Sequence, residues 1–191
     1  MIAPPECGSR SRLTRRNIIT MNNPPSYTCA FTGHRPQKLP WKYNETDSRC
    51  LALKTALSQQ IMKLVGEGVT DFFSGMAEGT DTYCAQIVLE MRKVNPALKL
   101  HCVLPCRSQA DKWPASAQER YRAILRCANS AVYVSREYHQ GCMLERNRRL
   151  VESAAVLLAV YNGEWRGGTA ATVRYAQKLD RRLIVLNPGD F

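Results

Sequence analysis

Short apolar runs alternate with amphipathic stretches along most of this chain. From Tyr27 onward, near-continuous apolar segments are separated by stretches in which apolar residues recur every three or four positions. The first pattern is typical of strands buried on both faces of a sheet, and the second predicts helices that pack through one face. The predicted strands are 27–33, 69–75, 98–105, 130–135, 154–163 and 181–188.

Helical patterns fill the intervals between these strands. Asp47 is the expected N-cap of the first helix, which Gly66 ends, and Thr80 is the expected cap of the second. The remaining predicted helices lie at 116–127, 144–152 and 169–179. Strands that alternate with helices predict an α/β fold: a Rossmann-like three-layer domain with a mostly parallel sheet of about six strands.

The first 25 residues differ in composition from the rest. They hold four arginines against one glutamate, and four of the ten prolines. This composition predicts a disordered basic arm at 1–25, followed by a single Rossmann-like domain at 26–191. Met21 lies so close to the first strand that translation starting there is one interpretation of the arm, and a nucleic-acid-binding tail is another.

Charge and hydropathy narrow the class of partner. The formal net charge of +11 and the pI of about 9.5 favour an anionic partner: a nucleotide, a nucleic acid or a phosphorylated metabolite. No apolar run approaches the roughly 20 residues that span a bilayer, and no secretory signal is visible. We therefore expect a cytoplasmic protein with no membrane partner.

Cysteine usage gives no metal site. The chain has eight cysteines but no CxxC pair, and several of the cysteines lie in apolar runs. In a cytoplasmic protein such residues are expected to be reduced thiols, so the sequence predicts neither a disulfide framework nor a bound metal.

Loops that follow the predicted strands carry the candidate site, because ligands of parallel sheets bind beyond the carboxyl ends of the strands. The first loop, TGHRP, offers Gly33 for close backbone approach and His34 and Arg35 as donors to an anion. The second, SGMAEGTD, places Gly75 and Gly79 before a helix, which is the general construction of an anion site. Asp81 follows as a first-turn residue or a ribose contact.

The later loops add a basic cluster and a second glycine-to-helix junction. Arg146, Asn147 and Arg148 are expected on one short helix, as a phosphate-neutralising group or as a solvated basic face. Gly167 and Gly168 would present backbone N–H groups, and Thr169 would cap the helix or contact a phosphate. The candidate ligand-binding residues are Gly33, His34, Arg35, Gly75, Gly79, Asp81, Arg146, Asn147, Arg148, Gly167, Gly168 and Thr169.

Several motifs resemble a known family when they are taken together and in order. They are FTGHRP (31–36), FSGMAEGTD (73–81), LPC (104–106) with the downstream Trp113 and QERY (118–121), the RN of ERNRRLV (145–151) and AVYNGEWRGGTAATVRYA (159–176). In this combination the chain is similar to the YpsA-like family of bacterial proteins, within the SLOG superfamily of Rossmann-like domains. The resemblance implies a nucleotide or a nucleotide-derived ligand, such as a nucleoside phosphate or an ADP-ribose-like molecule, which the protein senses or processes.

Two relatives within that superfamily define the alternatives. LOG-type phosphoribohydrolases cleave the N-glycosidic bond of a nucleoside monophosphate with the help of a glutamate, and Thr172 stands at that position here. A hydroxyl cannot replace a carboxylate in this role, so Glu78, Asp81, Glu145 or Glu164 would have to supply it.

DprA-type proteins bind single-stranded DNA, which agrees with the basic charge. No aromatic and basic residues interleave here as a recognisable stacking platform, and Trp113, Tyr121 and Trp165 are the candidate walls for a base. No catalytic residue and no cofactor beyond such a nucleotide ligand are assigned. The sequence is compatible with a homo-oligomer and does not determine the oligomeric state.

Overall fold

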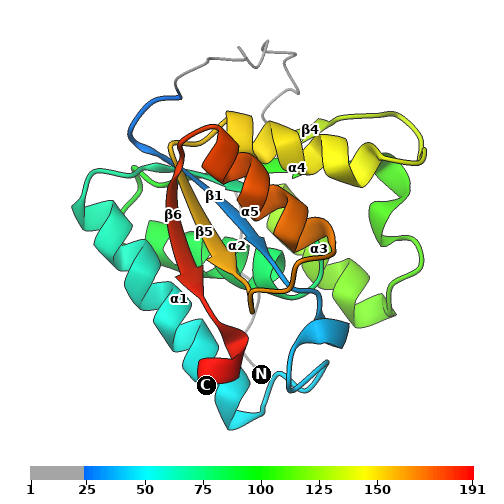
Figure 1. Ribbon diagram of the computed structural model, residues 1–191, viewed down its shortest axis with the longest axis horizontal. Coiled ribbons are helices and arrows are strands. Elements are labelled where there is room, and N and C mark those ends of the chain that lie inside the picture. The colour runs from blue at the N-terminus through cyan, green and yellow to red at the C-terminus, as the bar shows by residue number, and fades with distance from the viewer. Residues whose placement is uncertain (1–23) are drawn as a thin grey trace.

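Six parallel strands form the central sheet of the computed structural model, which describes residues 24–191 (Figure 1). The strands are β1 (Thr28–Gly33), β2 (Asp71–Ser74), β3 (Lys99–Leu104), β4 (Ser130–Tyr133), β5 (Val156–Val160) and β6 (Arg182–Leu186). Their order across the sheet is β4-β3-β2-β1-β5-β6, and every neighbouring pair is parallel. The predicted fold class and each predicted strand are therefore confirmed.

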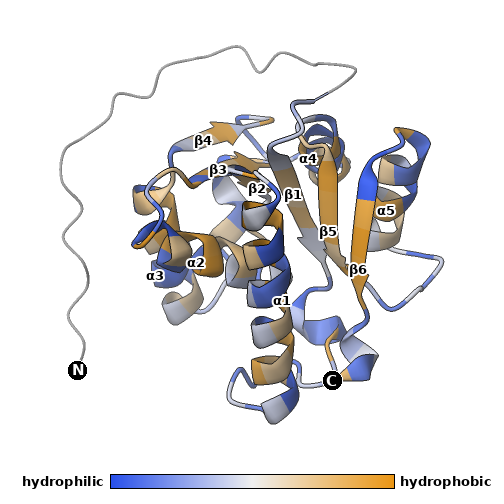
Figure 2. Ribbon diagram, turned by 90° about the vertical axis from the view of Figure 1, so that its left-hand side faces the viewer, coloured by the Kyte–Doolittle hydropathy of each residue, from blue (hydrophilic) through white to orange (hydrophobic). Residues whose placement is uncertain are grey.

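Five helices cover the two faces of the sheet. They are α1 (Ser48–Gly66), α2 (Thr80–Arg92), α3 (Ala115–Cys127), α4 (Cys142–Glu152) and α5 (Gly168–Lys178). The first three pack against one face and α4 and α5 against the other, as the side view in Figure 2 shows. Three short 3₁₀ helices, Pro36–Lys38, Arg107–Ala110 and Pro188–Asp190, lie in loops.

The two central strands explain why this sheet is buried on both faces. All five residues of β5 are buried, and in β1 only the last residue is partly exposed. Alternate side chains of these strands enter the two cores, so Phe31 packs with the α1–α3 side, where it stacks on Phe72 at 5.7 Å, while Ala30 faces α4 and α5. The outer strands β4 and β6 keep partly exposed residues, as expected at sheet edges.

Strand order fixes where a ligand site can form. From β1 the chain steps outward to β4, and it then returns to the opposite side of β1 to lay down β5 and β6. The direction of winding therefore reverses between β1 and β5. The chain continues from these two strands to helices on opposite faces, α1 after β1 and α5 after β5, and a crevice forms at the carboxyl ends of the strands.

One of the two predicted helix caps differs in the structure. Asp47 caps α1 as predicted and accepts a hydrogen bond from the Arg49 N–H at 2.9 Å. Gly79, rather than Thr80, is the N-cap of α2, because its backbone has a φ of +88° that favours glycine. The Thr80 hydroxyl instead donates to the carbonyl of His34 at 3.3 Å.

Three further expectations concern the N-terminal arm, membrane-spanning helices and the cysteines. The predicted arm at 1–25 lies almost entirely outside the described residues. Within 24–191, no helix is both long and apolar enough to cross a membrane. Six cysteines in this part of the chain are buried free thiols, namely Cys29, Cys50, Cys84, Cys102, Cys106 and Cys142.

Candidate functional site

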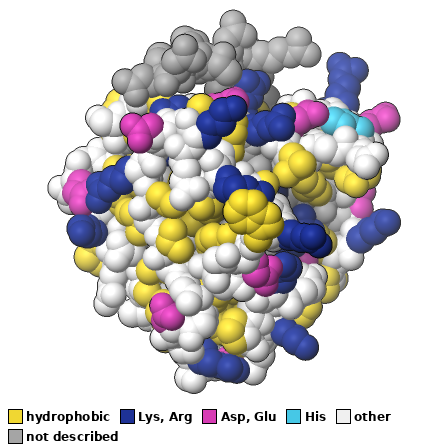
Figure 3. Space-filling view, in the orientation of Figure 1, with side chains coloured by type: hydrophobic (Ala, Val, Ile, Leu, Met, Phe, Trp, Pro, Cys, Tyr) yellow, Lys and Arg dark blue, Asp and Glu magenta, His cyan; other side chains and the backbone are white. Residues whose placement is uncertain are grey.

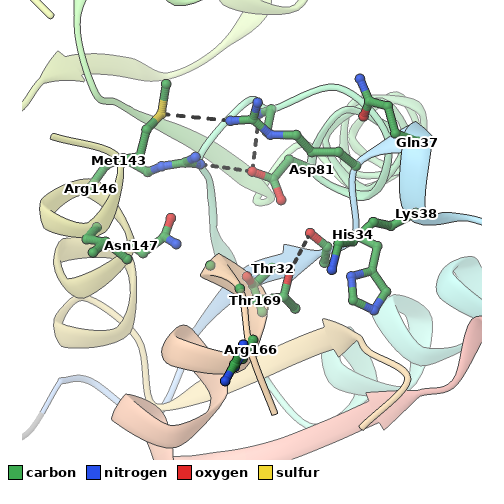
Figure 4. Close-up of a pocket in the computed structure, with 16 residues that line it drawn as sticks. Thr32, His34, Gln37, Lys38, Asp81, Met143, Arg146, Asn147, Arg166 and Thr169 are labelled. Carbon is green, nitrogen blue, oxygen red and sulfur yellow. Dashed lines mark hydrogen bonds and ion pairs between the residues drawn. The ribbon is translucent and has the colours of Figure 1, made fainter. Parts of the chain in front are cut away.

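A cavity of about 400 Å³ opens at the point where the winding of the sheet reverses. We refer to it as the switch-point cavity. The loops after β1 and β5 meet there, since the His34 N–H donates to the carbonyl of Val160 at 3.2 Å and His34 Nε2 lies 2.9 Å from Asn162 Oδ1. The remaining walls come from the starts of α2, α4 and α5 (Figure 4).

The structure brings nine of the twelve predicted site residues to this cavity. These nine are Gly33, His34, Arg35, Asp81, Arg146, Asn147, Gly167, Gly168 and Thr169. Gly75, Gly79 and Arg148 do not line it. Arg148 is exposed on α4, Gly79 borders a different cavity, and Gly75 lies behind the Arg146 guanidinium.

Positive charge dominates the lining. Arg35, Lys38, Arg146 and Arg166 contribute four cationic side chains, and Asp81 contributes one carboxylate. Lys38 pairs with Glu164, which lies outside the lining, whereas Arg35 and Arg166 form no ion pair within residues 24–191. The cavity is therefore electrostatically suited to an anion.

Arg146 and Asp81 form a buried ion pair at the back of the cavity. Arg146 Nη1 donates to Asp81 Oδ2 at 3.0 Å, and both side chains are about 95% buried (Figure 4). The same carboxylate oxygen accepts a hydrogen bond from the Ala77 N–H at 3.2 Å. Burial raises the pKa of Asp81, and the Arg146 charge and the Ala77 hydrogen bond oppose that shift. Asp81 is thus held as a structural partner of Arg146 and α2.

Gly75 provides the space that this ion pair occupies. A Cβ built on Gly75 would lie 1.3 Å from Arg146 Nη1 and 2.9 Å from Asp81 Oδ2. The guanidinium therefore rests directly on the backbone at this residue. Its Nε is buried without a hydrogen-bond partner among residues 24–191.

The N-terminus of α5 forms the opposite wall. Gly167 is its N-cap, with a φ of +108°, and the first intrahelical hydrogen bond runs from the Ala171 N–H to the Gly167 carbonyl. The N–H groups of Gly168, Thr169 and Ala170 consequently have no intrahelical acceptor. Thr169 does not cap the helix; its hydroxyl donates to the Gly33 carbonyl at 3.0 Å and ties α5 to β1.

Gly33 has a packing role in addition to its place in the lining. A Cβ at this residue would lie 2.4 Å from Thr80 Oγ1, which already contacts the loop after β1. The missing side chain lets the start of α2 pack directly on the end of β1. The sequence predicts that a ligand comes close to the backbone at Gly33. In the structure the side chain of Thr80 takes that place.

Thr172 lies behind the cavity rather than in it. This residue is 2% exposed, its hydroxyl donates to the Gly168 carbonyl at 2.7 Å, and it accepts from Asn147 Nδ2 at 2.8 Å. Glu78, Glu145 and Glu164 do not line the cavity either. Asp81 is therefore the single carboxylate in the lining, and it is committed to Arg146.

Sequence reasoning missed Lys38 and Arg166, which line the cavity, and Asn162, which lies beside His34. Arg166 directly precedes the glycine pair at the start of α5, and this position is the signal that could have found it. Asn162 lies two residues after the end of β5 and supplies the orienting partner of His34 that the sequence did not reveal. Lys38 belongs to the 3₁₀ turn after Pro36, which no apolar periodicity marks.

Aromatic residues flanking the site form no continuous stacking surface in the described chain. Trp113 packs edge-on against Tyr121 at 5.4 Å, and Trp165 is 77% exposed beneath Arg174 at 4.9 Å. On the face seen in Figure 3, Lys and Arg side chains are spread around hydrophobic ones rather than gathered in one track. Among residues 24–191, no three His, Cys, Asp or Glu side chains are grouped as metal ligands.

An all-parallel sheet with a basic, glycine-lined cavity at its switch point defines a Rossmann-like α/β protein. The particular family is shown by a family model, described as the YspA SLOG family, that matches residues 29–184. The chain belongs to this family, as its motifs predicted.

Curated relatives agree with that assignment. A UPF0398 protein of Lysinibacillus sphaericus is 24% identical over 166 residues, covering 84% of this chain and 92% of the relative. Another, from Bacillus licheniformis, is 26% identical over 155 residues, covering 80% and 84%.

Solved structures share the fold at low sequence identity. DNA processing protein A of Streptococcus pneumoniae matches with a TM-score of 0.55 and 14% identity, covering 88% of this chain but 52% of that protein, so this chain spans about half its length. The Helicobacter pylori protein of the same name, described for its single-stranded DNA binding mode, gives 0.56 and 19%, covering 85% and 69%.

Proposed function

We propose that the switch-point cavity binds the phosphate of a nucleotide or a nucleotide derivative, such as a nucleoside phosphate or an ADP-ribose-like molecule. One observation carries the proposal: four cationic side chains and a single, already paired carboxylate surround the open N-terminus of α5. Free N–H groups at a helix start and guanidinium donors are the two groups that proteins most often present to phosphate.

The cations divide into two roles. Arg146 is buried and paired, so it fixes the back of the cavity and contributes mainly its positive field. Arg35, in the loop after β1, and Arg166, just before α5, are exposed and have no ion-pair partner among the described residues. Neither side chain is committed to a carboxylate, since Arg35 donates only a weak hydrogen bond, to Met143 Sδ at 3.9 Å, so both can close on a phosphate that rests on the N–H groups of Gly168 and Thr169.

Binding is proposed without a hydrolytic step. Cleavage of an N-glycosidic bond needs a carboxylate that is free to act on the substrate or on water. Thr172 is buried in a link between α4 and α5, and Asp81 is engaged by Arg146 and Ala77. This arrangement favours a protein that holds and senses its ligand.

A thermal-shift screen tests the proposal. Nucleoside mono- and diphosphates and ADP-ribose should each be added at increasing concentration, because a ligand that binds only the folded state raises its melting temperature. At 100 times its Kd a ligand adds about 2.7 kcal/mol. For a chain of this size that corresponds to a rise of about 5–11 °C.

Arg166→Gln and Arg148→Gln form a matched pair of variants. Arg166 lines the cavity and Arg148 does not, although both are exposed arginines. Loss of a charge-assisted hydrogen bond should weaken binding about 10- to 100-fold in Arg166→Gln, and Arg148→Gln should bind as the wild type does. Absence of any nucleotide response, together with stabilisation by single-stranded DNA that salt abolishes, would instead favour nucleic-acid binding. Release of free base from a nucleoside monophosphate would overturn the non-hydrolytic role.

A further inference from the structure

A second cavity, of about 340 Å³, lies beside the first at the same edge of the sheet. We refer to it as the aromatic cavity. Its walls come from the loops after β1, β2 and β3 and from the first turns of α2 and α3. The residues that matter for its chemistry are Tyr43, Glu78, Tyr83, Trp113, Ala117 and Arg120.

One thin wall of chain separates the two cavities. In each of three places, one residue lines the switch-point cavity and the next residue in sequence lines the aromatic cavity. The pairs are Arg35 and Pro36, Ala77 and Glu78, and Asp81 and Thr82. The wall is compact, because a Cβ on Gly79 would lie 3.0 Å from the His34 carbonyl oxygen and 3.1 Å from Pro36 Cδ. A ligand that crosses the rim beside Arg35 would reach both cavities.

The charge balance of the aromatic cavity differs from that of its neighbour. Arg120 donates to Glu45 at 2.5 Å, and Lys54 donates to the same carboxylate at 2.7 Å, so the basic groups here are already matched. Tyr43 and Trp113 supply ring surface, whereas Tyr83 is 2% exposed and belongs to the core. This cavity lacks the excess of cations that would hold a phosphate, and it has the walls that would hold a ring.

Unused hydrogen-bonding groups also face this cavity. The Glu78 carboxylate accepts no hydrogen bond from any residue in 24–191. Burial raises the pKa of Glu78, and the charges of Arg35 and Arg120 oppose the shift. At the start of α3, the first intrahelical hydrogen bond runs from the Gln118 N–H to the Pro114 carbonyl, which leaves the N–H groups of Ser116 and Ala117 free. An acceptor and two donors are thus available to a polar ring edge or a ribose hydroxyl.

We propose that the aromatic cavity binds the nucleoside part of the ligand whose phosphate occupies the switch-point cavity. This inference rests on the proposed function. The heterocycle packs against Trp113 and Tyr43, Glu78 accepts from an amino or hydroxyl group, and the phosphate chain passes Arg35. The preferred ligand is therefore a nucleotide rather than inorganic phosphate or a sugar phosphate.

Calorimetric titration of the full chain with ADP and with pyrophosphate tests this assignment, because the two probes differ by the adenosine. Wild type should bind ADP about tenfold or more tightly than pyrophosphate, since contacts of a base with aromatic walls contribute on that scale. Ala117→Phe, which fills the aromatic cavity, should remove that advantage and leave pyrophosphate binding unchanged. The matched control is Ala115→Phe, on an exposed residue of the same helix turn that lines neither cavity.

The outcomes separate the two proposals. If ADP and pyrophosphate bind equally, or if Ala117→Phe weakens neither, the nucleoside site is wrong while the phosphate site stands. If neither probe binds wild type, both proposals fail. Glu78→Ala gives a second route should Ala117→Phe not fold: it should lower ADP affinity severalfold without affecting pyrophosphate, and equal loss for both probes would overturn the assignment.

Discussion

Replacement of Gly75 by alanine is expected to unfold much of the site by displacing one guanidinium. The new methyl group would lie 1.3 Å from Arg146 Nη1 and 2.5 Å from Cζ, so the side chain of Arg146 has to move. Its ion pair with Asp81 is then lost, while both groups stay in an environment that buries about 95% of each. Removing one partner of a buried ion pair costs about 3–5 kcal/mol.

That loss is large compared with the stability of the whole protein. Domains are typically stable by about 5–15 kcal/mol. The melting temperature should therefore fall by about 6–20 °C, at about 2–4 °C per kcal/mol for a chain of this length. Urea unfolding followed by circular dichroism measures the free energy. Gly66→Ala is the control, because no atom lies within 4 Å of the added methyl group, and it should be neutral or slightly stabilising.

A double-mutant cycle tests the reasoning itself. In an Arg146→Met background the guanidinium is gone, so Gly75→Ala should cost far less than it does in the wild type. Equal costs in the two backgrounds would refute the view that Gly75 acts by making room for Arg146.

Two further predictions concern helix linkage and pH. Thr172→Val removes the hydroxyl that joins Asn147 Nδ2 to the Gly168 carbonyl, and it should cost about 1–2 kcal/mol in urea unfolding, because the part-buried Asn147 amide loses its acceptor; an unchanged midpoint would show that water replaces the hydroxyl. Burial raises the pKa of Glu45, but the hydrogen bonds from Lys54 and Arg120 outweigh it, and the net pKa is lowered. A lowered pKa in the folded state stabilises the protein above the unfolded pKa, and this contribution is lost as pH falls through the folded value. Wild type should therefore lose stability in acid more steeply than Glu45→Gln, and parallel acid profiles would contradict this.

Most of the fold could be predicted from the sequence because its signals are local. A fully apolar run such as VLLAV (156–160) and the helical repeat that ends at Gly66 need no tertiary information. The Thr80 cap was wrong because it depended on backbone geometry instead. Thr80 has the chemistry of an N-cap, but the N-cap is Gly79, one residue earlier, which has a positive φ. The hydroxyl of Thr80 instead donates a hydrogen bond to the His34 carbonyl.

The site was harder to predict because its contacts are distant in sequence. Asp81 and Arg146 were both expected to meet a ligand, yet they lie 65 residues apart and bond to each other. No local pattern indicates that pairing, or that Gly75 has to be small because of it. Arg166 was recoverable, since it directly precedes the glycine pair, whereas Lys38 contributes only because of the turn in which it lies.

The reversal of winding between β1 and β5 also bears on the order of synthesis. The first wall of the switch-point cavity ends at Lys38, but the α5 wall begins only near Arg166, more than a hundred residues later. A nascent chain can pair β1 through β4 while half of the cavity is still unmade. Such long-range closure is slow relative to local structure. A ligand held between the two walls would therefore bind only after the final β5–α5–β6 segment has folded, and its binding would stabilise that folded segment.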